Sequence, residues 1–201
     1  MKQGYIMPEQ KLSRKALKTK KQIKNALAEF LQTKELKDIT VQEVARKADI
    51  SRTTFYNYYY DVYDIYEQLE KEVLAELGLL TLNFHYDPSK NYGDEFFNYI
   101  TQNPEIFKMI FSPYNTGELR YKITNMIEGV FRLIQTEKNA LEITDKELDY
   151  FSAFWSSGCI AVIEKWVQKE FSPSKDYIIK TLTEFEQQME VFIASQLGLA
   201  R

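Results

Sequence analysis

The fold is decided by the stretch Thr40-Val-Gln-Glu-Val-Ala-Arg-Lys-Ala-Asp-Ile-Ser-Arg-Thr-Thr-Phe-Tyr-Asn-Tyr-Tyr59. It opens with a capping box, in which the Thr40 hydroxyl and the Glu43 carboxylate satisfy each other's backbone donors, so a short helix is expected to start here. Asp49 lies where the chain must turn, and Asp is one of the few non-glycine residues that tolerate a left-handed backbone. Ser51 is a good N-cap for a second short helix over 52–59. The stretch therefore predicts two short helices joined by a tight turn, the outline of a helix-turn-helix.

A basic helix is expected directly before this pair. Ile23, Leu27, Phe30 and Leu31 follow the spacing of one helical face, which predicts a helix within 13–32 that starts between Ser13 and Thr19. Residues 1–60 hold 13 Lys and Arg against 6 Asp and Glu, a net charge of +7, whereas 61–201 hold 13 against 23, a net of −10. This division is typical of a basic module for a polyanion joined to an acidic body.

The rest of the chain is predicted to form six further helices and no strand, which makes the fold class all-α. Apolar residues recur every three or four positions after Asp61, which predicts a long fourth helix that couples the two parts directly. Proline and capping signals then divide the chain. The expected landmarks are the end of the fourth helix at Asp87-Pro88, helices on both sides of Asn103-Pro104, a break at Ser112-Pro113, a helix over 119–134, another from the Thr144 capping box to about residue 170, and a last helix after Pro173.

Composition excludes several classes of protein. The chain has 201 residues, of which 44% are hydrophobic and 27% charged, with only 7 Gly and 5 Pro, so it can bury a sizeable helical core. No stretch approaches the ~20 apolar residues of a membrane span, and residues 1–10 lack the apolar region of a secretory signal, so a cytoplasmic protein without membrane partners is expected.

Catalytic and metal-binding devices are also missing from the sequence. His85 is the single histidine, and Cys159 is the single cysteine, which is expected to be a small buried hydrophobe. The sequence has no Gly-x-Ser-x-Gly elbow and no glycine-rich phosphate loop. We therefore expect neither an enzyme nor a metal site nor a cofactor.

The second helix of a helix-turn-helix enters the DNA major groove. Arg52, Thr53 and Asn57 are expected to read base edges, because Arg pairs well with guanine and Asn with adenine. Phe55, Tyr59 and Tyr60 are assigned to packing. Contacts to phosphate oxygens are expected from the start of the second helix and from neighbouring hydroxyls and ammonium groups, namely at Thr40, Thr54, Tyr56, Tyr58, Lys20 and Lys24.

At these residues the sequence resembles the TetR family of bacterial transcriptional regulators. The resemblance covers 19–65 and is carried by Ile39-Thr-Val-Gln-Glu-Val-Ala45, Ala48-Asp-Ile-Ser-Arg-Thr-Thr-Phe-Tyr56 and Tyr59-Tyr-Asp-Val-Tyr-Asp-Ile65. Two residues depart from the family pattern. Asp49 replaces the usual turn glycine, and Val62 replaces a lysine common at the start of the fourth helix, so one family phosphate contact is missing. Asn103-Pro-Glu-Ile-Phe107 and Gly158-Cys-Ile-Ala-Val-Ile-Glu-Lys-Trp166 resemble a subset that includes regulators of dihydroxyacetone kinase operons.

The resemblance implies a helix-turn-helix DNA-binding domain over 1–60 and a helical dimerisation and effector-binding domain over 61–201. It further implies a homodimer formed by the last two long helices, a double-stranded operator, and repression relieved by an unidentified small molecule. The dimer contacts are assigned to Trp166, Ile178, Leu182, Phe185, Met189 and Phe192; on the last helix they follow the seam spacing of helices that pack lengthwise.

Aromatic residues of the body can line an effector pocket or fill the core, and periodicity does not separate these roles. The pocket candidates are Phe97, Phe107, Phe131, Phe151 and Trp155. Two alternatives to the effector-released repressor remain open. One is a regulator, which could also be an activator, whose body binds a protein co-regulator; a body without a closed pocket of a few hundred Å³ would favour it. The other is a helical interaction protein without DNA binding.

Overall fold

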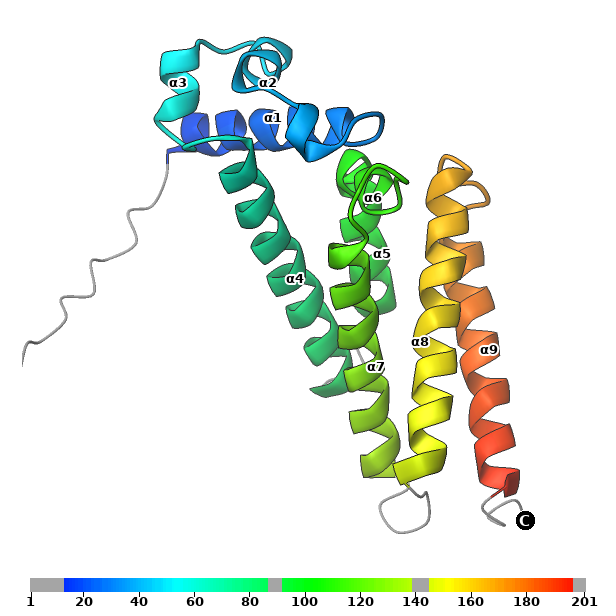
Figure 1. The fold of residues 1–201 in the computed structure, drawn as a ribbon. Coiled ribbons are helices and arrows are strands. Elements are labelled where there is room, and N and C mark those ends of the chain that lie inside the picture. Colours follow the sequence, from blue (N-terminus) through cyan, green and yellow to red (C-terminus); the bar gives the residue numbers. More distant parts are fainter. Residues whose placement is uncertain (1–12, 87–91, 139–144, 197–201) are drawn as a thin grey trace, which may run out of the picture.

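A computed structural model describes residues 13–86, 92–138 and 145–196 of the chain. These residues form nine α-helices and one short 3-10 helix and contain no strand, which confirms the all-α prediction (Figure 1). The elements are α1 (Arg14–Phe30), η1 (Leu36–Asp38), α2 (Val41–Lys47), α3 (Arg52–Tyr56), α4 (Val62–Tyr86), α5 (Tyr92–Gln102), α6 (Pro104–Ile110), α7 (Glu118–Lys138), α8 (Asp145–Gln168) and α9 (Lys175–Gln196).

The helices form two groups. An amino-terminal module of α1, α2 and α3 lies across one end of a helical body formed by α4 to α9 (Figure 1). The α4 helix contacts α1 as well as α5 and α7, so it couples the module to the body, as the sequence predicts. The α9 helix packs on α5 and α8, on the side of the body away from α4.

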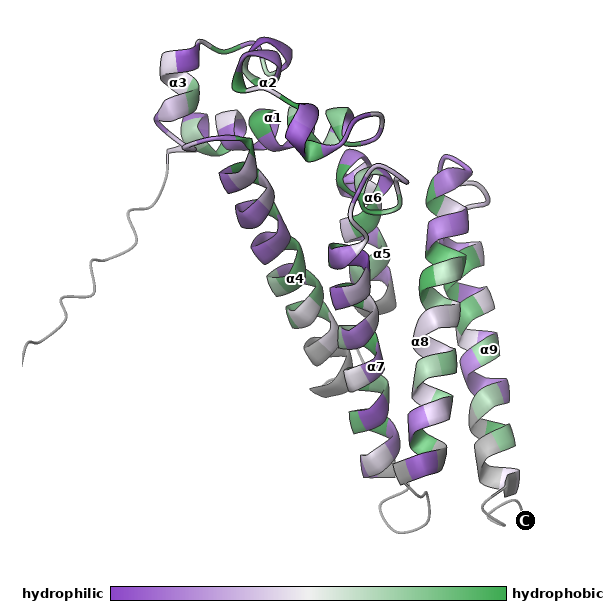
Figure 2. Cartoon of the chain, in the orientation of Figure 1, coloured by the Kyte–Doolittle hydropathy of each residue, from purple (hydrophilic) through white to green (hydrophobic). Residues whose placement is uncertain are grey.

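One continuous hydrophobic core runs through both groups. Ile23 and Phe55 are fully buried in the amino-terminal module, and Leu77 and Ile100 are fully buried in the body. Hydrophobic and hydrophilic residues alternate along each helix (Figure 2), as expected where one face of a helix is buried. Among the described residues, no helix is long and apolar enough to cross a membrane.

Trp166 belongs to this core. Its ring packs edge-on against Phe97 and Phe171, with ring centroids 5.6 and 5.3 Å away, and its side chain is only 2% exposed. The indole N–H donates to the Pro173 carbonyl at 2.8 Å, which meets the only polar requirement of a buried tryptophan. The assignment of Trp166 to a dimer interface is therefore wrong.

Two helix boundaries are refined by the structure. α1 starts after Ser13, whose hydroxyl accepts a hydrogen bond from the Ala16 amide. α3 ends at Tyr56, three residues before the predicted end. The Tyr58 and Tyr59 amides both donate to the Phe55 carbonyl, so the chain tightens and turns after this point. The expected capping box at Thr144 lies outside the described residues.

Candidate nucleic-acid interface

The turn between α2 and α3 has the backbone geometry that the sequence predicts. Asp49 adopts a left-handed conformation with φ of 54°. Its amide donates to the Arg46 carbonyl at 3.2 Å, and the Ile50 amide donates to the Ala45 carbonyl at 3.0 Å. These bonds satisfy the last carbonyls of α2 and redirect the chain, so that Ser51 can cap α3 by accepting from the Thr54 amide at 3.0 Å.

The start of α2 is held by a small network around Glu43. The Glu43 carboxylate accepts hydrogen bonds from the Lys34 ammonium at 2.8 Å and from the amide and hydroxyl of Thr40 at 2.9 and 2.8 Å. The bond from Lys34, followed by those from Thr40, lowers the pKa of Glu43 to about 2. Because both Thr40 hydrogens are donated to Glu43, Thr40 anchors the start of α2, while its contact with a phosphate stays a prediction.

The structure exposes the three residues predicted to read bases. Arg52, Thr53 and Asn57 are all exposed on α3 and its C-cap, whereas Phe55 is fully buried. Thr54 is half-buried, and its hydroxyl shares a 2.9 Å hydrogen bond with the Ser51 hydroxyl. α3 thus presents one guanidinium, one hydroxyl and one amide to the surroundings.

The four tyrosines from Tyr56 to Tyr60 have different environments. Tyr56 is 51% exposed and rests edge-on against Phe55, while Tyr58 is half-buried and packs against the core. Tyr59 is buried, as predicted, but Tyr60 is 88% exposed and does not pack. The Tyr60 amide donates to the Asp64 carboxylate at the start of α4, which fixes the backbone just where the side chain leaves the core.

Lys20 and Lys24 face α4. Lys20 donates to the Gln68 side chain at 3.2 Å and lies over the Tyr59 ring, and Lys24 forms an ion pair with Glu72. Both lysines precede Leu27, by seven and three positions, which places them beside the buried stripe of α1. Both lysines therefore join α1 to α4, and their role as phosphate contacts stays a prediction.

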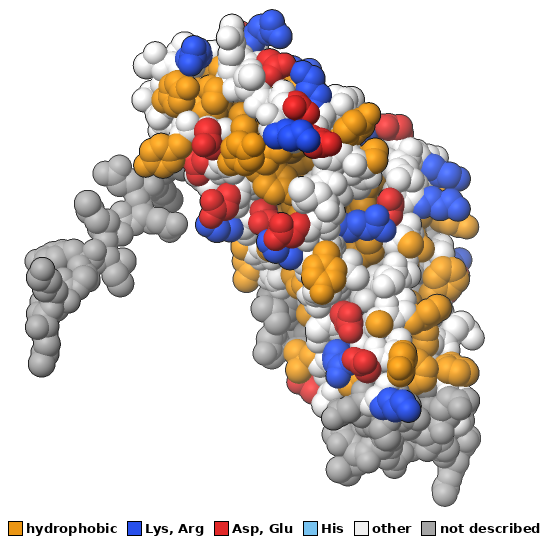
Figure 3. Space-filling view, in the orientation of Figure 1, with side chains coloured by type: hydrophobic (Ala, Val, Ile, Leu, Met, Phe, Trp, Pro, Cys, Tyr) orange, Lys and Arg blue, Asp and Glu red, His pale blue; other side chains and the backbone are white. Residues whose placement is uncertain are grey.

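Other cations are exposed at the same end of the molecule (Figure 3). These cations are Arg14, Lys15, Lys18, Lys21, Arg46 and Arg52. None of them forms an ion pair with a residue that the structure describes. The spacing along α1 could have identified Lys18 and Lys21, because they lie five and two positions before Ile23 and so fall off its buried stripe. We call these six residues the basic surface.

The residues predicted to line an effector pocket do not gather around one cavity. Phe97 packs on Trp166 and Phe107 on Tyr99, Phe131 pairs with Trp155, and Phe151 pairs with Phe192. A gap in the body between Leu77, Phe107 and Ile160 has a volume of about 10 Å³, which is room for at most one water. These rings pair in separate parts of the body, and their place in an effector pocket stays a prediction.

An exposed apolar stripe runs along α8 and α9 (Figure 3). Phe185 and Phe192 are 54% and 50% exposed, Leu182 and Met189 are half-buried, and Ile178 is buried in the protomer, which removes it from the predicted dimer contacts. The sequence-based assignment missed the α8 residues Tyr150 and Phe154, each 68% exposed. Gly158 is also exposed on α8, with open space where a Cβ would lie.

The described residues contain no group of three His, Cys, Asp or Glu side chains that could hold a metal ion. Cys159 is buried as predicted, and burial raises the pKa of its thiol to about 12. A capped helix-turn-helix on a helical body is the architecture expected of an all-helical transcriptional regulator.

Comparisons with known proteins support this class. Residues 90–188 match the family described as the transcriptional regulator C-terminal region, of the TetR type. The uncharacterised HTH-type transcriptional regulator YxbF of Bacillus subtilis (strain 168) is 21% identical over 178 residues, or 85% of this chain. The match covers 45% of YxbF, so this chain spans about half the length of that relative.

Two solved structures share the fold. The dihydroxyacetone kinase operon activator DhaS superposes with a TM-score of 0.57 at 18% identity, covering 90% of this chain and 97% of DhaS. The fatty acid degradation regulator FadR from Bacillus halodurans superposes with a TM-score of 0.59 at 13% identity, covering 83% of this chain and 93% of FadR. The matched family model and the named relatives support a transcriptional regulator of the TetR type. The matched proteins are named as regulators rather than enzymes.

Proposed function

We propose that the protein is a cytoplasmic, homodimeric regulator that binds a palindromic operator through its amino-terminal module. The observation that carries this proposal is the exposure of Arg52, Thr53 and Asn57 on a capped α3, next to the basic surface. The DNA-binding domain then comprises residues 1–60, and the dimerisation and effector domain comprises 61–201.

Base reading and phosphate binding fall to different residues in this proposal. Arg52 contacts guanine, Asn57 contacts adenine, and Thr53 reads either base or a thymine methyl. Lys18 and Lys21 supply charge to the phosphates, and hydroxyl contacts come from Thr54, Tyr56 and Tyr58. The exposed positions of Lys18, Lys21 and Tyr56 support these roles.

The homodimer is proposed to form through the apolar stripe of α8 and α9. Phe154, Phe185 and Phe192 are large side chains that are at least half exposed in the protomer, and exposed apolar patches of this kind mark interaction sites. Gly158 lets a second backbone approach closely at the middle of α8. A two-fold axis here buries the same stripe from both copies and sets the two α3 helices about 34–36 Å apart.

The proposed output is repression that a small molecule relieves. A ligand can release the dimer from DNA only to the extent that the ligand binds the DNA-free form of the dimer more tightly than the DNA-bound form. A second candidate is an activator whose body binds a protein co-regulator. The name of the structural neighbour DhaS, an operon activator, favours this candidate.

Selection of bound sequences from random DNA tests the proposed function. We expect an enriched palindrome, and we expect the triple variant Arg52→Ala, Thr53→Ala, Asn57→Ala to lose the sequence preference. Arg52→Ala alone is expected to weaken operator binding by about 1–3 kcal/mol and to relax specificity at one base pair. Arg132→Ala is the matched control, because Arg132 pairs with Asp149 in the body.

Equal binding of all sequences by the unchanged protein would contradict the proposal. A reporter gene placed behind the selected operator separates the two candidate outputs. Expression that falls when the regulator is produced indicates a repressor, and expression that rises indicates an activator.

A further inference from the structure

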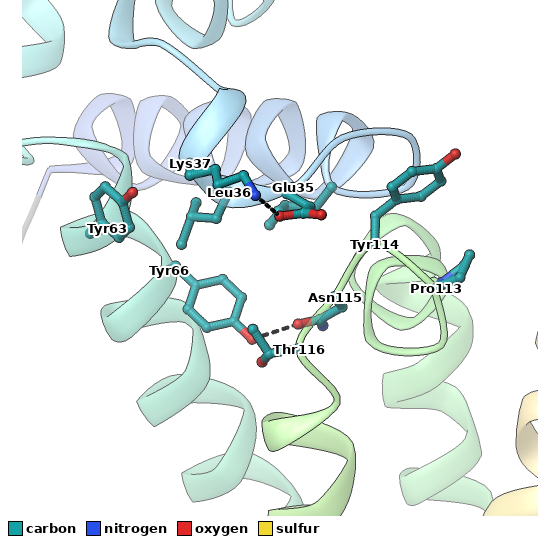
Figure 4. A pocket seen from close by; sticks show the side chains of 10 residues that line it. Glu35, Leu36, Lys37, Tyr63, Tyr66, Pro113, Tyr114, Asn115 and Thr116 are labelled. Atoms are coloured by element: carbon teal, nitrogen blue, oxygen red, sulfur yellow. Dashed lines mark hydrogen bonds and ion pairs between the residues drawn. The ribbon is translucent and has the colours of Figure 1, made fainter.

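A cleft of about 440 Å³ lies where the amino-terminal module meets the helical body (Figure 4). Leu31 and residues 35–37, at the start of η1, form one side, and Tyr63 and Tyr66 of α4 form a second. The loop 113–116 between α6 and α7 forms the third side. We call this space the junction cleft. Its volume falls within the range of small-molecule sites, and it is much larger than the gap inside the body.

The lining is mostly aromatic and apolar. Tyr63, Tyr66 and Tyr114 contribute three rings, and Leu31, Leu36 and Pro113 contribute aliphatic surface. Leu36 and the Tyr66 ring point into the space between η1 and α4 (Figure 4). Flat rings with aliphatic neighbours bind the faces of planar aromatic compounds well.

The polar groups of the junction cleft mainly offer acceptors. The Tyr66 hydroxyl donates to the Asn115 side-chain oxygen at 2.9 Å and also interacts with the Thr116 hydroxyl, which leaves one lone pair of the phenol oxygen for a ligand. The Asn115 amide nitrogen donates to the Met109 carbonyl at 3.2 Å, which keeps the amide oxygen turned toward Tyr66. The Thr116 hydroxyl lies beside the same pair (Figure 4). A ligand group that donates a hydrogen bond fits this end.

The charges in the junction cleft cancel. Glu35 and Lys37 form an ion pair at 2.6 Å, so neither sign of charge prevails at the rim. We propose that the junction cleft binds a flat, uncharged aromatic compound, its ring packed between Leu36 and Tyr66 and a hydroxyl or N–H group donating to the Tyr66 oxygen.

Such a ligand acts on DNA binding because it touches both parts of the molecule. Leu36 belongs to the amino-terminal module, whereas Asn115 and Thr116 belong to the body. A ligand that fits one placement of the amino-terminal module on the body better than another changes the affinity for the operator. Operator DNA then changes the affinity for the ligand by the same factor. This step rests on the proposed DNA-binding function, whereas ligand binding itself does not.

Two probes with the same ring system test the site. 2-Naphthol carries a donor, and 2-methoxynaphthalene does not. Titration of the full chain without DNA is expected to show saturable binding of both, with 2-naphthol tighter. Tyr66→Phe keeps the ring but removes the oxygen, so 2-naphthol should bind roughly 3- to 10-fold more weakly and 2-methoxynaphthalene equally well. Tyr121→Phe, at a 65% exposed tyrosine on α7, is the matched control and should change neither affinity.

A second pair of variants tests the space rather than the hydrogen bond. Thr116→Trp places a ring in the junction cleft and should abolish binding of both probes, while Thr101→Trp, at an exposed position on α5, should not. Probe binding that survives Thr116→Trp would overturn the proposal. A change of oligomeric state in Thr116→Trp with unchanged probe binding would instead identify the cleft as an interface between copies, which also overturns it.

The DNA measurement comes last and separates the two proposals. With the selected operator, 2-naphthol should change affinity in the unchanged protein and have a smaller effect in Tyr66→Phe. Probe binding without any sequence-specific DNA binding would refute the proposed function and leave the site standing. Operator binding without probe binding would refute the site alone.

Discussion

The Glu43 carboxylate accepts hydrogen bonds from the Lys34 ammonium and from both donors of Thr40. These bonds lower its pKa from 4.5 to about 2 in the folded protein. A lowered folded-state pKa stabilises the protein above the unfolded-state value, and this stabilisation is lost as the pH falls through the folded-state value. We therefore predict that Glu43→Gln lowers the midpoint of thermal unfolding at neutral pH, and that the difference from the unchanged protein shrinks between about pH 4.5 and pH 2.

Glu67→Gln serves as the control for this prediction. Glu67 pairs with Lys71 on the exposed surface of α4, where an ion pair contributes little. Its unfolding midpoint should remain close to that of the unchanged protein at every pH. A Glu43→Gln deficit that stays constant down to acidic pH would show that the network does not depend on the ionised carboxylate.

Asp49 holds a left-handed backbone that glycine adopts without a steric penalty. We predict that Asp49→Gly stabilises the protein by about 0.5 kcal/mol, measured by urea unfolding, because the removed strain exceeds the entropy that glycine loses on folding. Gly117, with φ of 77° and open space where a Cβ would lie, is the reciprocal case. Gly117→Ala should destabilise by about 1 kcal/mol, and stabilisation by both substitutions would contradict the argument.

At the scale of the element, α1 separates its lysines by the face on which they lie. Lys18 and Lys21 are exposed, whereas Lys24 pairs with Glu72 of α4. Each phosphate contact contributes a slope of about −0.9 to log K against log salt. We predict that Lys18→Gln and Lys21→Gln each flatten this slope for operator binding by about 0.9, and that Lys24→Gln leaves it unchanged. A flattened slope in Lys24→Gln alone would support the original assignment of that lysine.

Elements with local signals were predictable from the sequence, and those set by packing were not. The capping box at Thr40, the turn at Asp49 and the cap at Ser51 depend on side chains bonding their own backbone. By contrast, the early end of α3 and the outward direction of Tyr60 depend on how Tyr59 fits the core.

The same limit applies to the aromatic residues of the body. Trp166 and Phe97 follow helical spacing that is compatible with a core, a pocket or an interface. Only their contacts with each other and with Phe171 decide among the three. Lys20 and Lys24 are a different case, because their distance from Leu27 along α1 already indicated a place beside the buried stripe.

In the whole molecule, polar side-chain contacts connect the amino-terminal module to the body, including the bond from Lys20 to Gln68 of α4. Lys24 pairs with Glu72 of α4, and the Gln32 side chain donates to Glu105 of α6 at 2.7 Å. The junction cleft opens between α4 and the loop that follows α6. Any rotation of the module on the body must therefore change the cleft, so a ligand placed there opposes or favours that rotation directly.

The proposed dimer is the largest-scale feature and gives the last prediction. Phe154 is 68% exposed on the apolar stripe of α8 and α9, and Tyr121, 65% exposed on α7, lies outside it. In a dimer that buries the stripe, Phe154→Glu leaves a carboxylate desolvated and without a cation, which costs several kcal/mol. We predict that sedimentation gives a monomer for Phe154→Glu and a dimer for Tyr121→Glu. The monomer should also bind the operator far more weakly. In the dimer, binding of one α3 helix to its half-site raises the effective concentration of the second α3 helix at the other half-site, and the monomer lacks this advantage. A Phe154→Glu protein that remains dimeric would place the two-fold axis on another surface.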